Sequence, residues 1–154
     1  MKRRTRLAGG VAVLAVAFVG MWEGLRLTAY RDVVGVPTIC YGETHGVQMG
    51  DKYGRADCDA ILLTSLMKHE AGMRRCLRDP DSIPEKSYVA FVSLTYNIGV
   101  NAFCRSTARK RLDAGDLRGA CDAATWFRKA GGRTIRGLIN RRMAEHDLCL
   151  EGVG

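Results

Sequence analysis

The order of apolar and polar residues predicts an apolar N-terminal segment, a short β region and then a series of helices. Residues 7–22 carry no charge, and the apolar residues within 22–30 predict a helix. The β-branched and aromatic residues in 36–42 predict a strand or hairpin. The glycine-rich stretch 42–54 predicts a loop with room for one more strand.

From residue 55 onward, apolar residues return every three or four positions, which predicts helices. The expected helices run from 55 to a break at 78–81, from Pro84 to Gly99, and over about 106–115, 116–131 and 134–150. Neither a repeat nor a low-complexity segment interrupts this order. The predicted fold class is therefore α+β, with a small β-rich lobe and a larger helical lobe.

The composition of the chain indicates a globular protein with an anionic partner. A chain of 154 residues with 47% hydrophobic and 26% charged residues fits one compact domain and excludes a disordered, collagen-like or coiled-coil protein. The net charge of +8 favours an anionic partner, either nucleic acid, a lipid surface or an envelope polymer. Because no basic stripe alternates with aromatic residues, we expect no nucleic-acid partner.

The six cysteines favour disulfides over a metal site. The chain contains no Cys-x-x-Cys pair and no histidine at zinc-ligand spacing, so neither a metal nor a cofactor is expected. An even number of cysteines favours three disulfides in an oxidising compartment, whereas free thiols in a cytosolic protein are the alternative. Six cysteines allow 15 pairings. Short loops between neighbouring elements favour Cys40–Cys58, Cys76–Cys104 and Cys121–Cys149.

The first 22 residues have the order of an export signal. Four cations precede the apolar segment: Lys2, Arg3, Arg4 and Arg6. The 16 residues of segment 7–22 span about 24 Å as a helix, less than the ~30 Å of a bilayer core, and seven of them are Gly or Ala. A signal cleaved after Ala17, a lasting anchor and a weak anchor that later leaves the bilayer all remain open, and the composition favours the third. An ordinary buried helix would not explain the leading cations.

Glu23, Asp32 and Thr38 are the candidate catalytic residues. The predicted elements place Glu23 on a helix, Asp32 at the end of that helix and Thr38 on the following strand. Hydrolysis of an acetal needs one protonated carboxyl group to donate to the leaving oxygen and one carboxylate to assist water. Each residue also has a structural alternative: complementing the positive end of a helix, forming a turn, or pairing in a strand.

These residues stand in a wider motif. It consists of Glu23-Gly24-Leu25-Arg26-Leu27-Thr28-Ala29-Tyr30-Arg31-Asp32, then Gly35, Thr38-Ile39 and Tyr41-Gly42. The motif resembles the phage-type lysozymes of glycoside hydrolase family 24. That resemblance implies a lysozyme-like fold with the active-site cleft between the lobes. It also implies Glu23 as the general acid, and Asp32 and Thr38 as the residues that position the attacking water.

The resemblance extends to about residue 150 and suggests residues that contact the sugar. These candidates are Tyr41, Glu43, Asn97, Ser106, Arg133 and Arg136. Helix capping is an alternative role for Asn97 and Ser106, and a solvated basic surface is the alternative for the two arginines. Two positions depart from the family pattern: Cys40 stands where glycine is frequent, and Glu43 where histidine is frequent.

The resemblance includes the signal-anchor-release endolysins of phages and prophages. It implies a segment 1–22 that first tethers the chain to the host inner membrane through residues 7–22, and a muramidase domain over 23–154. The protein would be exported to the periplasm, inactive while tethered, and active as a monomer on peptidoglycan after release. The expected reaction hydrolyses the β-1,4 bond between N-acetylmuramic acid and N-acetylglucosamine. A lytic transglycosylase and a membrane-perturbing lysis protein are the alternatives.

Overall fold

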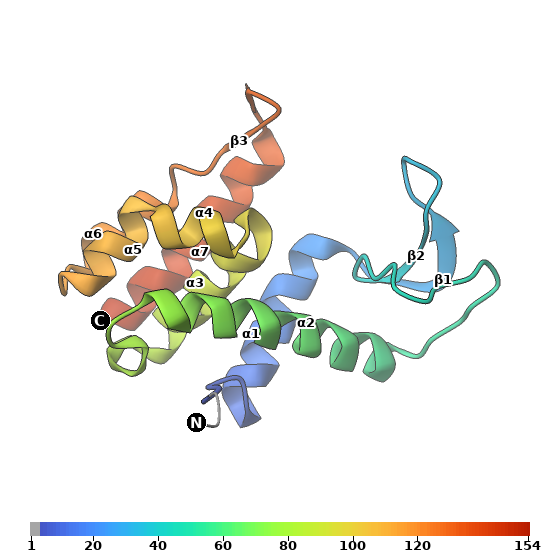
Figure 1. Cartoon of the computed structure of the whole chain (residues 1–154), viewed down its shortest axis with the longest axis horizontal. Helices are drawn as coiled ribbons and strands as arrows, with labels where there is room; N and C mark the ends of the chain where they lie inside the picture. Colours follow the sequence, from blue (N-terminus) through green and yellow to red (C-terminus); the bar gives the residue numbers. More distant parts are fainter. Residues whose placement is uncertain (1–3) are drawn as a thin grey trace. The chain divides into compact units, whose positions relative to one another are not determined.

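The chain is described over residues 4–154 in a computed structural model, so Lys2 and Arg3 of the basic start lie outside the described residues. The chain forms two compact units. Unit 2 is the continuous stretch Leu7–Ser65, whereas unit 1 combines the residues up to Arg6 with Leu66–Gly154. Figure 1 follows the chain through both units. The two ends of the chain therefore belong to the same unit.

Unit 2 contains one apolar helix, a small antiparallel sheet and the beginning of a second helix. Its elements are α1 (Gly9–Glu23), β1 (Arg26–Arg31), β2 (Pro37–Cys40) and the first part of α2 (Arg55–Cys76). β1 and β2 pair with Tyr30 opposite Thr38. The loop that follows adds to the sheet, because the Tyr53 amide donates to the Leu27 carbonyl at 2.9 Å. The extra strand predicted within 42–54 is therefore present only as isolated β-bridges, in which Lys52 pairs with Thr28 and Glu43 pairs with Ile39.

The helix predicted over residues 22–30 is wrong. Helix α1 ends at Glu23, and Gly24 has a φ of 72°, a left-handed value that stops a helix and suits glycine. Residues 26–31 instead form β1, because β2 on one edge and residues 51–53 on the other satisfy their backbone groups. Tertiary hydrogen bonding thus overrides the local apolar pattern.

Cys40 has an unusual backbone conformation. Its φ is 60°, and it is the one non-glycine residue of the described chain with a positive φ. The left-handed region favours glycine, which explains why glycine is frequent at this position of the family pattern. The Cys40–Cys58 disulfide ties the end of β2 to α2 and so holds this conformation.

Unit 1 is mainly helical. It contains the end of α2, a 3-10 turn at Pro80–Ser82, α3 (Glu85–Ile98), α4 (Val100–Arg105), α5 (Thr107–Asp113), α6 (Leu117–Ala124), the hairpin strands β3 (Lys129–Ala130) and β4 (Arg133–Thr134), and α7 (Arg136–Val153). Nine consecutive residues of α3, from Ser87 to Thr95, are buried, and α7 packs along this helix. The buried α3 is the core of unit 1. Helices with small antiparallel sheets make the chain α+β, as predicted.

The helices predicted from residues 55, 84, 106 and 134 are confirmed as α2, α3, α5 and α7, but two elements between them were not predicted. Helix α4 fills 100–105, and a hairpin occupies 129–134 where the end of a helix was expected. Gly131 and Gly132 have φ values of 56° and 77°, which suit the two central residues of a hairpin turn. The glycine pair therefore reverses the chain, and α6 ends earlier, at Ala124.

All three predicted disulfides are present. Cys40–Cys58 lies in unit 2, and Cys76–Cys104 and Cys121–Cys149 lie in unit 1. The two disulfides of unit 1 each join a residue to another 28 positions away. Each bond therefore fastens elements of one unit.

Replacing Gly72 by alanine is expected to lower the free energy of unfolding by about 1–3 kcal/mol. A Cβ at Gly72 would lie 2.6 Å and 2.7 Å from the two γ-methyl groups of Val100. Because the β-branched side chain of Val100 has few allowed rotamers, these methyl groups cannot move far away. Gly137→Ala in α7 is the matched control, because nothing lies within 4 Å of its Cβ position. The control should gain up to about 1 kcal/mol. Urea unfolding of both variants measures the difference, and equal effects would contradict the prediction.

Candidate active site

Glu23 is the last residue of α1 and is half-buried. Gly24 then turns the chain so that β1 begins at Arg26. The carboxyl group therefore sits at the C-terminal end of its helix, where the helix dipole is negative. The structural alternative for Glu23 was to complement the positive end of a helix, and it does not apply because Glu23 lies at the C-terminal end of α1.

Asp32 and Thr38 both form a hydrogen bond with the backbone of Val36. Asp32 lies in the turn after β1, where its Oδ1 accepts from the amides of Val34 at 3.0 Å and Val36 at 2.9 Å. The Thr38 hydroxyl, on β2 and 3% exposed, donates to the Val36 carbonyl at 2.8 Å. Asp32 Oδ2 accepts no hydrogen bond from the described residues. Asp32 thus forms the turn through Oδ1, and its role in catalysis stays a prediction.

Two further candidates, Tyr41 and Glu43, follow β2. The Tyr41 hydroxyl donates to Asp59 Oδ1 of α2 at 2.6 Å. Burial is the main cause that raises the pKa of Tyr41, and this hydrogen bond is the second. Glu43 is half-buried, and its Oε1 accepts from the His45 amide at 2.8 Å. Both side chains thus have local roles within unit 2, and a role in sugar binding stays a prediction.

The remaining candidates lie in unit 1. Asn97 is exposed near the end of α3, and Arg133 and Arg136 are exposed on β4 and at the first residue of α7. Ser106 is buried and caps α5, because its Oγ accepts from the Arg109 amide at 3.1 Å. For Ser106 the structure therefore shows the capping role, and sugar contacts of the other three stay predictions.

A buried ionic cluster in unit 1 was not predicted. It comprises Ser93 of α3 and Arg141, Arg142 and Glu145 of α7, each no more than 4% exposed. Glu145 Oε1 lies 2.7 Å from Arg142 Nε, and Glu145 Oε2 accepts from the Ser93 hydroxyl at 2.6 Å. Burial raises the pKa of Glu145 and lowers that of Arg142. The adjacent arginines were the only signal of this cluster in the sequence, and nothing there indicated that they are buried.

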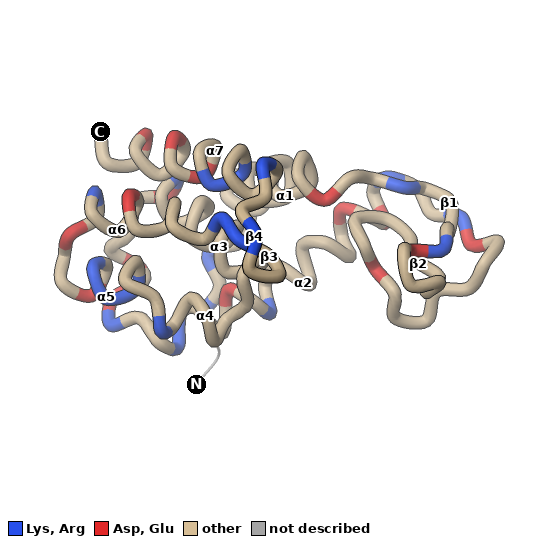
Figure 2. The backbone as a smooth tube through the Cα atoms, turned by 90° about the horizontal axis from the view of Figure 1, so that it is seen from above, with Lys and Arg blue, Asp and Glu red and all other residues tan. Residues whose placement is uncertain are grey.

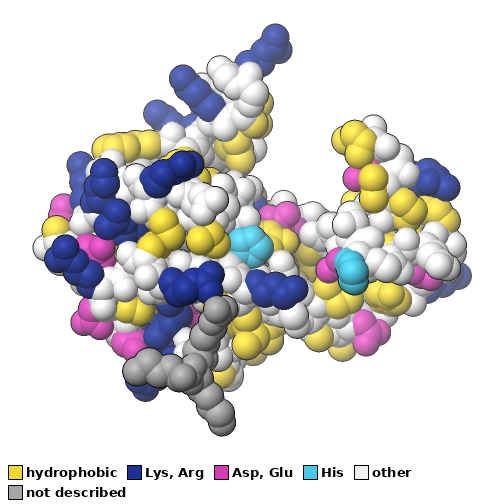
Figure 3. All heavy atoms as spheres, viewed as in Figure 1, with side chains coloured by type: hydrophobic (Ala, Val, Ile, Leu, Met, Phe, Trp, Pro, Cys, Tyr) yellow, Lys and Arg dark blue, Asp and Glu magenta, His cyan; other side chains and the backbone are white. Residues whose placement is uncertain are grey.

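The positive charge of the chain is concentrated in unit 1. Unit 1 contains 20 Lys and Arg residues and 10 Asp and Glu residues. Unit 2 contains 4 Lys and Arg residues and 6 Asp and Glu residues. Figure 2 shows basic residues on α5, on α7 and in the β3–β4 hairpin, and Figure 3 shows many of them on one face of unit 1. Unit 1 is therefore the part suited to an anionic polymer.

Comparison with known proteins decides the family. The family model described as phage lysozyme matches residues 20–145, a stretch that includes Glu23, Asp32 and Thr38. The chain belongs to the phage lysozyme family. A protein named SAR-endolysin from Bacteriophage PS119 is 36% identical to this phage lysozyme over 150 residues, which cover 94% of the chain and 89% of the relative.

Solved structures confirm the lysozyme-like fold. An endolysin from Escherichia coli O157:H7 phage FAHEc1 matches with a TM-score of 0.80 and 32% identity, covering 98% of this phage lysozyme and 94% of that chain. The muramidase domain of SpmX from Asticaccaulis excentricus matches with a TM-score of 0.80 and 26% identity, covering 96% and 99%. The chain is thus a lysozyme-type enzyme.

Proposed function

We propose that this phage lysozyme is an endolysin that hydrolyses the β-1,4 bond between N-acetylmuramic acid and N-acetylglucosamine in peptidoglycan. The observation that carries the proposal is the arrangement around Val36, which fixes both Asp32 and Thr38 and leaves Asp32 Oδ2 available. Glu23 supplies a second carboxyl group within the same unit. Two carboxyl groups with separate tasks are what hydrolysis of a glycosidic bond requires.

The proposed reaction assigns one task to each side chain. Glu23 gives its proton to the glycosidic oxygen as the bond from that oxygen to the anomeric carbon breaks. A water molecule donates one hydrogen bond to Asp32 Oδ2 and one to the Thr38 oxygen, whose own proton is engaged with Val36. The lone pair of the water then forms the new bond to the anomeric carbon, and its proton passes to Asp32. Attack from the face opposite to the leaving group inverts the configuration.

We further propose that residues 1–22 act as a signal-anchor-release segment ahead of a catalytic domain over 23–154, and that the enzyme reaches the periplasm before release. The SAR-endolysin of Bacteriophage PS119 covers 94% of the chain, and the basic start fits an orientation with the N-terminus in the cytoplasm. Within residues 4–154, the structure shows no helix that is both long and apolar enough to cross a membrane.

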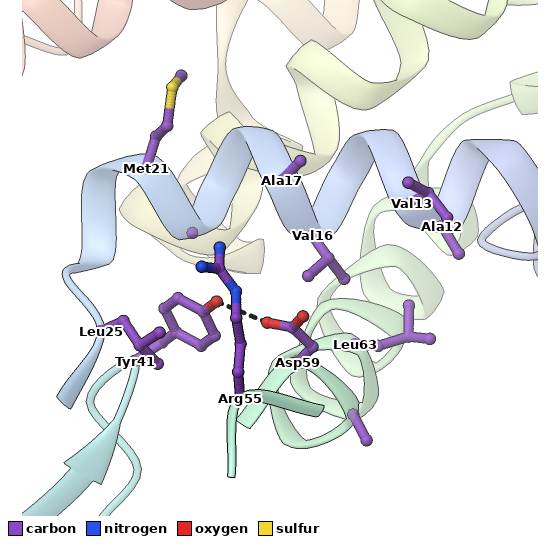
Figure 4. A pocket seen from close by; sticks show the side chains of 12 residues that line it. Ala12, Val13, Val16, Ala17, Met21, Leu25, Tyr41, Arg55, Asp59 and Leu63 are labelled. Atoms are coloured by element: carbon purple, nitrogen blue, oxygen red, sulfur yellow. Dashed lines mark hydrogen bonds between the residues drawn. The ribbon is translucent and has the colours of Figure 1, made fainter. Parts of the chain in front are cut away.

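The packing of α1 supports a link between release and activity. Figure 4 shows α1 beside Tyr41 and α2, around a largely apolar pocket of about 460 Å³. Gly20 faces the Tyr41 ring so closely that a Cβ there would lie 3.0 Å from Tyr41 Cε1. Helix α1 also ends in Glu23. A helix held in the bilayer cannot make these contacts, so the tethered chain would lack a correctly placed proton donor.

The masses of the products test hydrolysis against the transglycosylase alternative. Purified peptidoglycan digested by the full chain should release muropeptides that end in reducing N-acetylmuramic acid, each carrying the atoms of one added water. Asp32→Asn keeps an oxygen for the Val34 and Val36 amides but removes the charge that accepts the proton, so the rate should fall by about 10²-fold or more. Anhydro sugars as the main product would show that the enzyme is a transglycosylase.

A further inference from the structure

The N-terminal residues Thr5 and Arg6 are bound to a buried carboxylate of unit 1. The Thr5 hydroxyl donates to Glu70 Oε1 at 2.5 Å, and the Arg6 amide donates to Glu70 Oε2 at 3.1 Å. Glu70, on α2, is only 1% exposed. The Tyr88 hydroxyl of α3 donates to Glu70 Oε2 at 2.8 Å. Burial raises the pKa of Tyr88, which keeps this donor protonated.

The Arg6 side chain binds to two backbone carbonyls and an aromatic ring beside this carboxylate. Arg6 Nη1 donates to the carbonyls of Pro80 at 3.1 Å and Ile83 at 2.8 Å, and the guanidinium lies 4.3 Å from the centre of the Tyr88 ring. Arg74 holds that ring from the hydroxyl side, with its Nη1 donating to the Tyr88 oxygen at 3.0 Å. The site therefore recognises one residue by its amide, its charge and its planar side chain.

Glu70 depends on the N-terminus for its donors. A buried carboxylate is costly unless hydrogen bonds replace the lost water. Two of the three donors described above come from Thr5 and Arg6, and only the Tyr88 hydroxyl comes from elsewhere. A chain cleaved after Ala17 would lose both of these donors. Cleavage there would thus leave Glu70 with only the Tyr88 hydroxyl of these three donors.

We propose that Glu70 and Tyr88 form a docking site for Thr5 and Arg6 that traps the released form of the enzyme. The inference rests on the proposed signal-anchor-release route. While residues 7–22 cross the membrane, Thr5 and Arg6 lie on the cytoplasmic side and unit 1 lies in the periplasm, so the docking site is empty. Once the segment leaves the bilayer, the two residues can bind, and their binding opposes a return to the membrane.

Fractionation of cells that express the full chain tests the trap. After a protonophore abolishes the membrane potential, the ratio of periplasmic to membrane-bound protein should be about tenfold lower for Glu70→Gln than for the wild type, and several-fold lower for Thr5→Val. Arg6→Lys keeps the charge that orients the segment but loses the planar group over Tyr88, and should also lower the ratio. Glu85→Gln, an exposed site on α3, is the matched control and should release like the wild type.

Trypsin provides a second readout that needs no membrane. In the purified wild type, cleavage after Arg6 should be about tenfold slower than in Glu70→Gln, because the half-buried side chain is held by its hydrogen bonds and must detach before the protease can bind it. Thr5→Val and Arg6→Lys change residues outside the core, so a folding defect would not explain their effect. Release and protection equal to those of the wild type in all three variants would overturn the docking site. Peptidoglycan digestion by the released protein is measured separately, so a lack of lytic activity would refute the proposed enzyme without affecting this result.

Discussion

Lytic activity is expected to fall by a factor of about 10²–10⁴ when Glu23 is replaced by glutamine. The amide has nearly the same shape but cannot give a proton to the leaving oxygen. Turbidity loss of a peptidoglycan suspension with purified protein measures the rate. Glu23 is half-buried at the end of α1, so circular dichroism and thermal unfolding should show that the variant remains folded. Glu85→Gln, which is exposed, is the matched control for the lost charge.

Glu23→Gln also distinguishes a muramidase from a membrane-perturbing lysis protein. A protein that kills cells by damaging the bilayer does not need a proton donor, so Glu23→Gln would remain lethal when expressed with its N-terminal segment. A muramidase variant would be exported and released but would leave the wall intact. Full lysis by the folded variant would refute both the assigned role of Glu23 and the proposed reaction.

The largest expected loss of stability follows from removal of the charge of Glu145. Glu145→Gln leaves Arg142, which is 1% exposed, buried without its carboxylate. Breaking a buried ion pair in this way costs about 3–5 kcal/mol. Glu151→Gln on α7 is the matched control, because the side chains of Glu151 and its ion-pair partner Lys86 are both about half exposed. Loss of this exposed pair should lower the free energy of unfolding by less than about 1 kcal/mol.

Urea unfolding at neutral pH measures both Glu-to-Gln variants. The midpoint for Glu145→Gln should move to clearly lower urea, and the midpoint for Glu151→Gln should stay near that of the wild type. Equal shifts would show that the ionic cluster around Glu145 adds nothing beyond an exposed pair.

Local signals in the sequence were sufficient for the parts of the fold that short-range patterns determine. The loop lengths between cysteines favoured the correct pairing, and the apolar repeat after residue 55 gave α2 and α3. The strand β1 was missed because its residues are apolar enough for a helix, and because one of its two partners, residues 51–53, lies beyond β2 in the sequence. Pairing between distant segments leaves little trace in a local pattern.

The candidate site shows the same limit. The sequence offered Asp32 either as a turn residue or as a catalytic carboxylate, and the structure allows both, since Oδ1 holds the turn while Oδ2 accepts no bond from the described chain. The partner of Arg6 was beyond prediction, because Glu70 lies 64 positions away and looks like any helical glutamate. The sequence pattern indicates an orientation signal for the leading cations, and the structure adds specific contacts for Arg6.

The three disulfides also bear on when the protein becomes folded. Each of them fastens one unit internally, and each contributes roughly 3 kcal/mol in an oxidising compartment. In the reducing interior of a host cell these bonds do not persist, so newly made chains would have weakly held units there. A loosely folded chain threads through a secretion channel more easily than a rigid one. In the export route proposed above, the disulfides would thus strengthen the enzyme only after the chain has crossed the membrane.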